Sequence, residues 1–284
     1  MKIPVRGIRT SPKGPDFSKD FNIREIQVLL HGKDLIEELH RHDHFFMLVL
    51  KTGTGTHDID FTPQSVSDHS IFFLRPGQVH QLTLKAKSTG YLIKFKPGFY
   101  HHPDKTFTQL LRNASRVNHY KLETAGFNKL LPLLAAILQE YTDRQPGYEE
   151  VIKSNLGILL IELTRQNKKD LPESGNAYAQ ERLEKLQELL ETHIATHKQV
   201  SHYAEMLNQS AYQLNAITKS TLGKTCSDLI NEQIILESKR HILATSDQIS
   251  HIAQDLGYED TSYFIRFFKK HTGYSPEAFR QKFK

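Results

Sequence analysis

The stretch SHIAQDLG at residues 250–257 decides the fold of the C-terminal part of the chain, because nearly the same frame, SHYAEMLN, stands at residues 201–208. The two frames share Ser, His, Ala and Leu at a constant offset of 49 residues. In the later copy Ile252, Ala253 and Leu256 have helical spacing, and Gly257 can adopt the positive φ that ends a helix. Asn208 takes the equivalent place in the first copy, and Asn is the next-best residue for a left-handed backbone. Each frame therefore predicts a short helix and a tight turn.

A second helix is predicted after each turn. In TSYFIRFFKKH, residues 261–271, three phenylalanines share one helical face, which we expect to be core, and Asp260 can cap the helix. A helix, a tight turn and an exposed second helix form a DNA-reading unit. The outward faces carry hydroxyl, amide, guanidinium and methyl groups that read base edges, and lysines that suit phosphates. These residues are Tyr212, Asn215, Ala216 and Lys219 in the first copy, and Thr261, Ser262, Ile265, Arg266 and Lys269 in the second.

The segment TCSDLINEQIILESKRHILAT, residues 225–245, joins the two copies. Thr225 can cap a helix here, with Asp228 three residues on. Such a helix, about 19 residues long, spans about 28 Å, which could hold two reading helices about one DNA turn apart on the same face of the duplex. One chain would then carry both reading helices, which in a dimeric repressor come from two chains.

Residues 181–283 resemble the DNA-binding domain of the AraC/XylS family of bacterial transcription regulators. The stretch ISHIAQDLGYEDTSYFIRFFKKHTGYSPEAFR follows the C-terminal signature of that family nearly throughout. The resemblance places major-groove contacts at Tyr212, Asn215 and Ala216, and at Thr261, Ser262 and Arg266. The first unit departs from the pattern, because Ala216 stands where a long polar or basic side chain is common and Thr218 where an aromatic one usually packs. The resemblance implies double-stranded DNA and RNA polymerase as partners and leans toward activation.

The N-terminal half reads as short strands between about residues 22 and 99. FFMLVL, THDIDF, SIFFLRPG, QLTLKA and GYLIKFK are β-rich runs separated by turn residues, which predicts a sandwich or small barrel. The stretches LHRHDHFFMLVLKTGTGTHDIDF and IFFLRPGQVHQL resemble the cupin-like sensing domain of the same family, which implies a small-molecule effector.

Helical periodicity replaces the strands from about residue 106 to residue 167. Ile152, Leu156, Leu159 and Leu163 have the rhythm of a helix that packs against a similar helix. These residues can cover the chain's own barrel or form a homodimer seam, and one helix could serve both purposes. The family resemblance implies dimerisation.

These features predict an α+β multidomain chain, with a cupin-like β-barrel and a helical dimerisation segment before an all-α domain of two helix-turn-helix units. We expect the sensing domain at 1–105, the helical segment at 106–170, an exposed linker at 171–180 and the DNA-binding domain at 181–284.

Histidines raise the question of a metal. His40, His42 and His44 alternate along a predicted strand, so they share one face, and His80 could approach them across a barrel. Metal-binding cupins have a similar His-x-His closely followed by a glutamate, but Phe45, Phe46 or Met47 fills that place here. The histidines are then polar groups of a ligand pocket or ordinary surface residues. We assign His40, His42 and His80 to ligand binding and expect no metal, no other cofactor and no catalytic residue. A cupin-type metal-dependent enzyme with a helical appendage is the alternative.

Composition is consistent with a cytoplasmic regulator. The single cysteine, Cys226, fits a reducing compartment, and neither a signal peptide nor a membrane span is visible. The formal net charge is +5, but from Glu181 onward 13 basic residues balance 13 acidic ones. Net charge alone would therefore point to the wrong half of the chain as the DNA-binding part.

Overall fold

The computed structural model describes residues 4–8, 20–99, 105–167 and 177–283 of the 284-residue chain. The chain divides into two compact units, one over Pro4–Leu171 and the other over Pro172–Lys284. Most of the predicted linker, residues 171–176, lies outside the described residues. Its last four residues, 177–180, which we expected in the linker, form the beginning of a helix.

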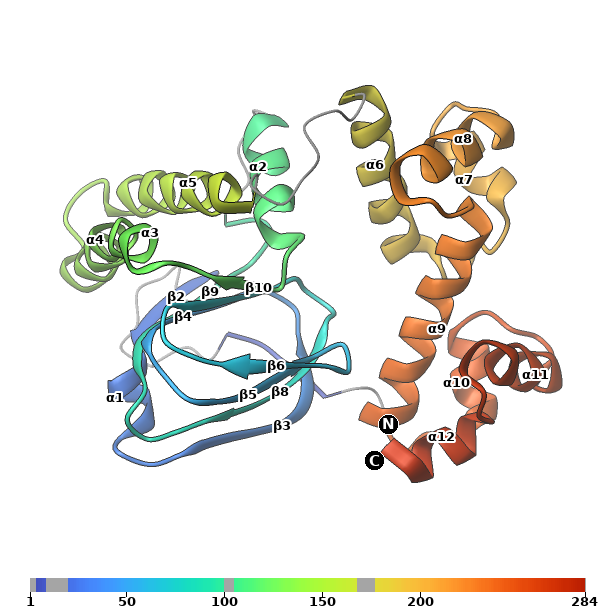
Figure 1. Ribbon diagram of the computed structural model, residues 1–284, viewed down its shortest axis with the longest axis horizontal. Coiled ribbons are helices and arrows are strands. Elements are labelled where there is room, and N and C mark those ends of the chain that lie inside the picture. The colour runs from blue at the N-terminus through green and yellow to red at the C-terminus, as the bar shows by residue number, and fades with distance from the viewer. Residues whose placement is uncertain (1–3, 9–19, 100–104, 168–176, 284) are drawn as a thin grey trace. The chain divides into compact units, whose positions relative to one another are not determined.

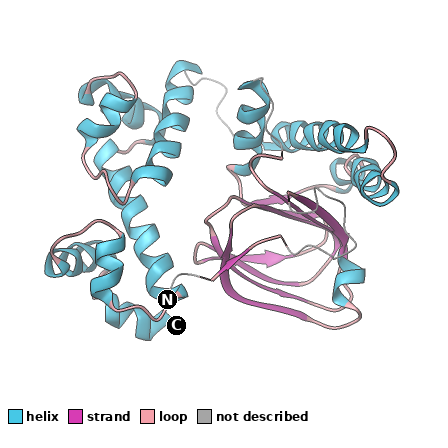
Figure 2. Cartoon of the chain, turned by 180° about the vertical axis from the view of Figure 1, so that it is seen from behind, coloured by secondary structure: helices cyan, strands magenta, loops and turns pink. Residues whose placement is uncertain are grey.

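The N-terminal unit contains two five-stranded sheets that face each other (Figures 1 and 2). The first sheet has the order β1 (Val5–Arg6), β3 (Leu35–His42), β8 (Val79–Leu84), β5 (Gly55–Ile59) and β6 (Thr62–Val66). The second sheet has the order β10 (His119–Lys121), β7 (Ser70–Leu74), β4 (Phe45–Thr52), β9 (Thr89–Phe95) and β2 (Phe21–Glu25). The pairing is antiparallel except between β1 and β3. The predicted cupin-like architecture is confirmed.

The second sheet is buried on both faces. Phe46, Leu48 and Leu50 of β4 point between the two sheets, whereas Met47 and Val49 point into a second core under the helices. Strands covered on both sides lose the alternation of apolar and polar residues and become continuous apolar runs. This burial explains why FFMLVL and SIFFL read so clearly as strands.

Four helices follow β9: α2 (Lys105–Ser115), α3 (Thr124–Asn128), α4 (Leu131–Asp143) and α5 (Tyr148–Asn167), while the short α1 (Ile26–Leu30) follows β2. The inner face of α5, formed by Ile152, Leu156, Leu159 and Leu163, is fully buried in the core beside the second sheet. These side chains therefore cover their own barrel. The segment predicted as helical at 106–170 also contains β10, which extends the second sheet by pairing with β7.

The C-terminal unit is entirely helical in its described residues (Figure 2). Its helices are α6 (Ala177–His193), α7 (Val200–Met206), α8 (Ala211–Leu222), α9 (Cys226–Ala244), α10 (Ile249–Asp255), α11 (Thr261–Thr272) and α12 (Pro276–Phe283). Over the residues that the model describes, no helix is long and apolar enough to cross a membrane.

Helix caps in this unit follow the sequence with one exception. Thr225 and Asp228 form the predicted capping box of α9, and the carboxylate of Asp260 accepts a hydrogen bond from the backbone of α11. The exception is α10, which begins after Gln248, whose side chain forms no capping bond, although Ser246 and Asp247 just before it are residue types that commonly cap helices. Asp247 is held outside the helix: its N–H donates to Thr245 Oγ1 at 3.2 Å, and its carbonyl accepts from Arg280 at 2.6 Å.

Candidate functional site

The two tight turns have the same geometry. Asn208 has a φ of 51° and Gly257 a φ of 72°, both left-handed as predicted. After the first turn, Gln209 N–H donates to the carbonyl of Ala204 at 2.8 Å, and Tyr258 N–H makes the equivalent bond to Ala253 at 2.8 Å. The two copies of the sequence frame are therefore two copies of one helix-turn-helix.

Lys198, in the connection before α7, joins the two copies. Its ammonium donates to the carbonyl of Ala195 at 2.9 Å and to the carbonyl of Gly257 at 3.0 Å, and it lies 4.9 Å from the ring centre of Tyr258. Burial lowers the pKa of Lys198. This side chain holds the start of the first helix-turn-helix against the turn of the second one.

The second helices of the two helix-turn-helix copies, α8 and α11, have the same pattern of buried positions. Leu214 and Thr218 of α8 have no exposed surface, and neither do their counterparts Phe264 and Phe268 of α11. The burial classes of residues 212–220 match those of residues 262–270 position by position. Each of these helices therefore presents an equivalent outward face.

The predicted DNA-binding residues occupy these outward faces to different degrees. Tyr212 is 84% exposed, the largest exposure among the large hydrophobic side chains of the described residues. The half-buried members of the set are Asn215, Thr261 and Ile265. The exposed members are Tyr212, Ala216, Lys219, Ser262, Arg266 and Lys269.

Two of these side chains have partners inside the protein. The Asn215 amide nitrogen donates to the carbonyl of Ala211 at 3.0 Å, and its oxygen accepts from the N–H of Cys226 at 3.0 Å. Asn215 thus caps the first turn of α9 from α8, a role that depends on a helix crossing and has no signal in the sequence. Arg266 lies 3.9 Å from a carboxylate oxygen of Asp260, but its side chain is 70% exposed.

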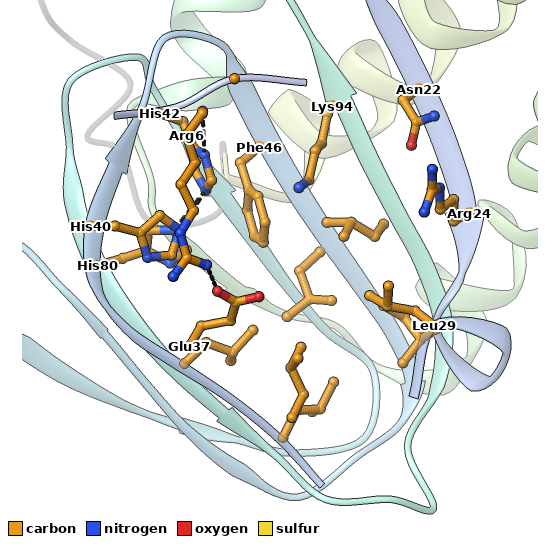
Figure 3. A pocket seen from close by; sticks show the side chains of 17 residues that line it. Arg6, Asn22, Arg24, Leu29, Glu37, His40, His42, Phe46, His80 and Lys94 are labelled. Atoms are coloured by element: carbon orange, nitrogen blue, oxygen red, sulfur yellow. Dashed lines mark hydrogen bonds and ion pairs between the residues drawn. The ribbon is translucent and has the colours of Figure 1, made fainter. Parts of the chain in front are cut away.

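The N-terminal unit contains a pocket of about 180 Å³ between its sheets (Figure 3). Its polar wall carries His40, His42 and His80 together with an ion pair between Arg6 and Glu37. Figure 3 shows these residues on one side of the pocket, across from Lys94 and Arg24. Its apolar wall consists of Ile26, Leu29, Leu35, Phe46, Leu48, Leu82, Leu84 and Leu92.

The predicted histidine set converges. His40 lies directly opposite His80 in the register of β3 and β8. His42 Nε2 lies 3.2 Å from His40 Nε2 and 2.8 Å from His80 Nε2, and all three residues are buried. His44, expected on the same face, lies beyond the end of β3, where its ring contacts Asp43. His44 does not belong to the converging group.

His57 of β5 was not singled out from the sequence, yet its Nε2 lies 2.8 Å from Nδ1 of His80. The signal that could have found it is the alternation in THDIDF, which places His57 and Ile59 on the inward face. Burial lowers the pKa of His40 to about 4, that of His42 to about 2 and that of His57 to about 3. Burial also lowers the pKa of His80 well below the ordinary range, so all four rings are neutral near pH 7.

Comparisons with known proteins agree with both halves of this structure. Residues 203–282 match the family model of a helix-turn-helix domain, and residues 33–114 match the model of the AraC-like ligand binding domain. The chain belongs to the AraC/XylS family. This AraC/XylS-family member is therefore a DNA-binding transcription regulator with a ligand-sensing N-terminal domain, and family membership favours that function over the alternative of a cupin-type enzyme.

Relatives of this AraC/XylS-family chain match it over most of its length. It is similar to the HTH-type transcriptional activator RhaS of Escherichia fergusonii, with 24% identity over 252 residues, covering 85% of this chain and 87% of the relative. RhaS of Citrobacter koseri is 24% identical over 269 residues, with the same coverage. Among solved structures, ToxT of Vibrio cholerae is 14% identical, with a TM-score of 0.44 over 93% of this chain and 98% of ToxT.

Proposed function

We propose that this regulator is a transcriptional activator that acts as a homodimer and places α8 and α11 of each chain in the major groove at two successive half-sites. The observation that carries the proposal is the matching outward face of α8 and α11 on either side of α9. A helix of 19 residues is about 28 Å long, close to one turn of DNA. Relatives named as activators support the direction of regulation.

Base recognition is assigned to the residues on those outward faces. In α11, Thr261, Ser262, Ile265 and Arg266 read base edges, with the Arg266 guanidinium as the donor suited to guanine. In α8, Tyr212 and Ala216 face the groove, and Asn215 contributes only if it leaves its bonds to Ala211 and Cys226. Lys219 and Lys269, exposed one turn further along, bind phosphates.

The effector is a small molecule held in the pocket of the N-terminal unit. A volume of about 180 Å³ resembles the cavity of about 150 Å³ that accommodates benzene in an engineered protein, so the effector is of the size of a small metabolite. Arg24 and Lys94 line one part of the pocket and leucines another. This lining suits a molecule with an oxygen-rich or anionic end and an apolar end.

Dimerisation is assigned to the outer face of α5. Val151 is 40% exposed and Ile158 is 47% exposed, and they lie seven residues apart on the side of α5 away from its buried face. The same spacing in a second chain could pair with it in a two-helix seam. Contact with RNA polymerase and a cytoplasmic location belong to the same proposal.

The test is recovery of bound genomic DNA by the full-length protein, followed by fluorescence anisotropy with a recovered fragment and with a shuffled fragment of equal composition. We expect binding to the recovered fragment to be tighter by a factor of about 10³ or more at physiological salt. Equal affinity for both fragments would overturn the proposal.

A further inference from the structure

We propose that His40, His42 and His80 bind one divalent first-row transition metal ion through their Nε2 atoms, on the polar wall of the pocket. This site goes beyond the proposed function and does not depend on it. It also departs from the expectation from sequence that the barrel holds no metal, which rested on the missing glutamate of the metal-binding cupins.

The positions of the ring protons indicate a cation. The Nδ1 atoms of His40 and His42 lie 2.6 Å from the carbonyl oxygen of Glu38 and 3.1 Å from that of Arg6, respectively. A carbonyl can only accept a hydrogen bond, so both Nδ1 atoms carry the proton and donate it. In neutral rings both Nε2 atoms then present lone pairs, and these two lone pairs face each other across 3.2 Å without a proton between them.

Such an arrangement of buried lone pairs is unfavourable unless a proton donor or a positive charge lies between them. His80 can donate its Nε2 proton to only one of the two rings, so hydrogen bonding within the trio leaves at least one lone pair without a donor. His57 cannot supply the missing donor, because its Nε2 contacts Nδ1 of His80 and its own Nδ1 contacts no hydrogen-bond partner. A metal ion satisfies all three Nε2 atoms at once.

The distances fit a transition metal. Nitrogen ligands of tetrahedral Zn²⁺ lie about 2.0–2.1 Å from the ion and hence about 3.3 Å from one another. The observed separations are 3.2 Å from His40 to His42 and 2.8 Å from His42 to His80, and all three atoms lie within 4.8 Å of one another. Small rotations of rings that stand on adjacent strands are enough to reach the ideal geometry.

The surroundings of the trio have the form of an outer coordination shell. Metal-binding histidines usually donate the second ring N–H to a carbonyl or another acceptor, which fixes the tautomer and the ring orientation. His40 and His42 have backbone carbonyls for this purpose, and His80 has Nε2 of His57 at 2.8 Å. All three proposed ligands thus have a positioned partner on Nδ1.

The ligand set selects the class of ion. Three neutral imidazoles suit Zn²⁺, Ni²⁺, Co²⁺ or Fe²⁺, whereas Mg²⁺ and Ca²⁺ require oxygen ligands. Three histidines also leave a tetrahedral ion one open position. Because all three rings line the pocket, that position faces the pocket and suits water or an oxygen atom of a bound small molecule.

The test uses the full-length protein, purified without a polyhistidine tag and stripped with a chelator. Zn²⁺ is titrated in competition with a chromophoric chelator, and Co²⁺ is added separately for its visible absorption. We expect one tight equivalent of Zn²⁺ per chain, no competition from Mg²⁺, and Co²⁺ bands of the intensity typical of a tetrahedral site. Absence of a tight equivalent, or of those bands, overturns the proposal and does not require a variant to fold.

Variants then locate the ion. His42→Gln and His80→Gln should each weaken Zn²⁺ binding about 100-fold or more, and His57→Phe, which removes the partner of His80, about 10- to 100-fold. Circular dichroism of the metal-free forms checks that each variant folds. The matched control is the double variant His193→Ala and His197→Ala, which removes a half-buried histidine pair of the C-terminal unit with ring centres 5.7 Å apart and should leave the tight equivalent unchanged. Loss of that equivalent in the control, or its retention in both glutamine variants, excludes the barrel site.

Discussion

Gly257 lies directly against the backbone of Ala195: a Cβ atom on residue 257 would stand 1.8 Å from the carbonyl oxygen of Ala195. It would also stand 2.7 Å from Nζ of Lys198. The turn of the second helix-turn-helix therefore requires glycine for two reasons, its positive φ and this close approach. Asn208, at the equivalent place in the first helix-turn-helix, shares only the positive φ.

The first prediction concerns that difference. Gly257→Ala should lower the free energy of unfolding of the C-terminal unit by about 1–3 kcal/mol, because the backbone is strained and Ala195 must move. Asn208→Gly, the matched change in the other turn, should alter it by no more than about 0.5 kcal/mol. Urea unfolding monitored by circular dichroism measures both, and similar losses in the two variants would contradict the argument.

Arg266→Ala should weaken binding of the operator by about 1–3 kcal/mol and relax the preference at a single base pair. The guanidinium is exposed on α11 and is held only loosely by Asp260, so it is available to a base edge. Anisotropy titrations against operators substituted at each position give the measurement. A uniform loss over all sequences would make Arg266 a phosphate contact.

Lys269→Ala should reduce the slope of log affinity against log salt by about 1 with little change in sequence preference. The ammonium is exposed on the last turn of α11, away from the N-terminal turn that carries the residues assigned to base edges, and a lysine there suits a phosphate. Binding measured at four or more salt concentrations gives the slope. An unchanged slope would remove Lys269 from the interface.

Replacing Val151 and Ile158 by glutamate should convert the dimer to a monomer, because charges would then lie in the proposed seam of α5. Ala135→Glu is the control, since Ala135 is also exposed but lies on α4, outside the proposed seam. Sedimentation velocity distinguishes the two species. A parent protein that sediments as a monomer, or a double variant that remains dimeric, would rule out this seam.

Cys226 should give the C-terminal unit an alkaline sensitivity. Burial raises the pKa of its thiol from 9.0 to about 11. The unfolded chain therefore loses this proton first, and the free energy of unfolding falls as the pH rises from about 9 to about 11. Urea unfolding at about pH 8 and about pH 10.5 should show a smaller decrease for Cys226→Ala than for the parent. Equal decreases in both proteins would show that the thiol does not contribute.

The helical part of the fold was predictable because its signals are local. The capping box of Thr225 with Asp228 and the left-handed turns at Asn208 and Gly257 each depend on a few neighbouring residues. The double burial of β4 made its strand evident. By contrast, β6 contains Pro63 and forms the edge of its sheet, and β10 is three residues long, so neither has a strong local pattern.

The details of the sites depend on contacts between distant segments. Asn215 looks like a base-reading amide until α9 supplies the N–H of Cys226 for it to accept. Arg280 looks like part of a basic surface, but it donates to the carbonyls of Ile242 and Asp247 and holds α12 against the rest of its unit. The histidine trio likewise requires the register of β3 with β8, in which His40 lies opposite His80. These pairings are set by tertiary packing rather than by spacing along the chain.

The shared burial rhythm of α8 and α11 has a consequence for how such a regulator can evolve. Each helix is anchored through two inward positions, Leu214 with Thr218 and Phe264 with Phe268, while most of the outward positions are exposed and, Asn215 excepted, make few contacts within the fold. Substitutions at these outward positions can accumulate in α8 independently of α11. The two half-sites of a promoter sequence can therefore diverge one at a time. Exchanging the exposed outward residues of α8 for those of α11, with Asn215 kept as the cap of α9, should accordingly give a folded protein that prefers a direct repeat of one half-site.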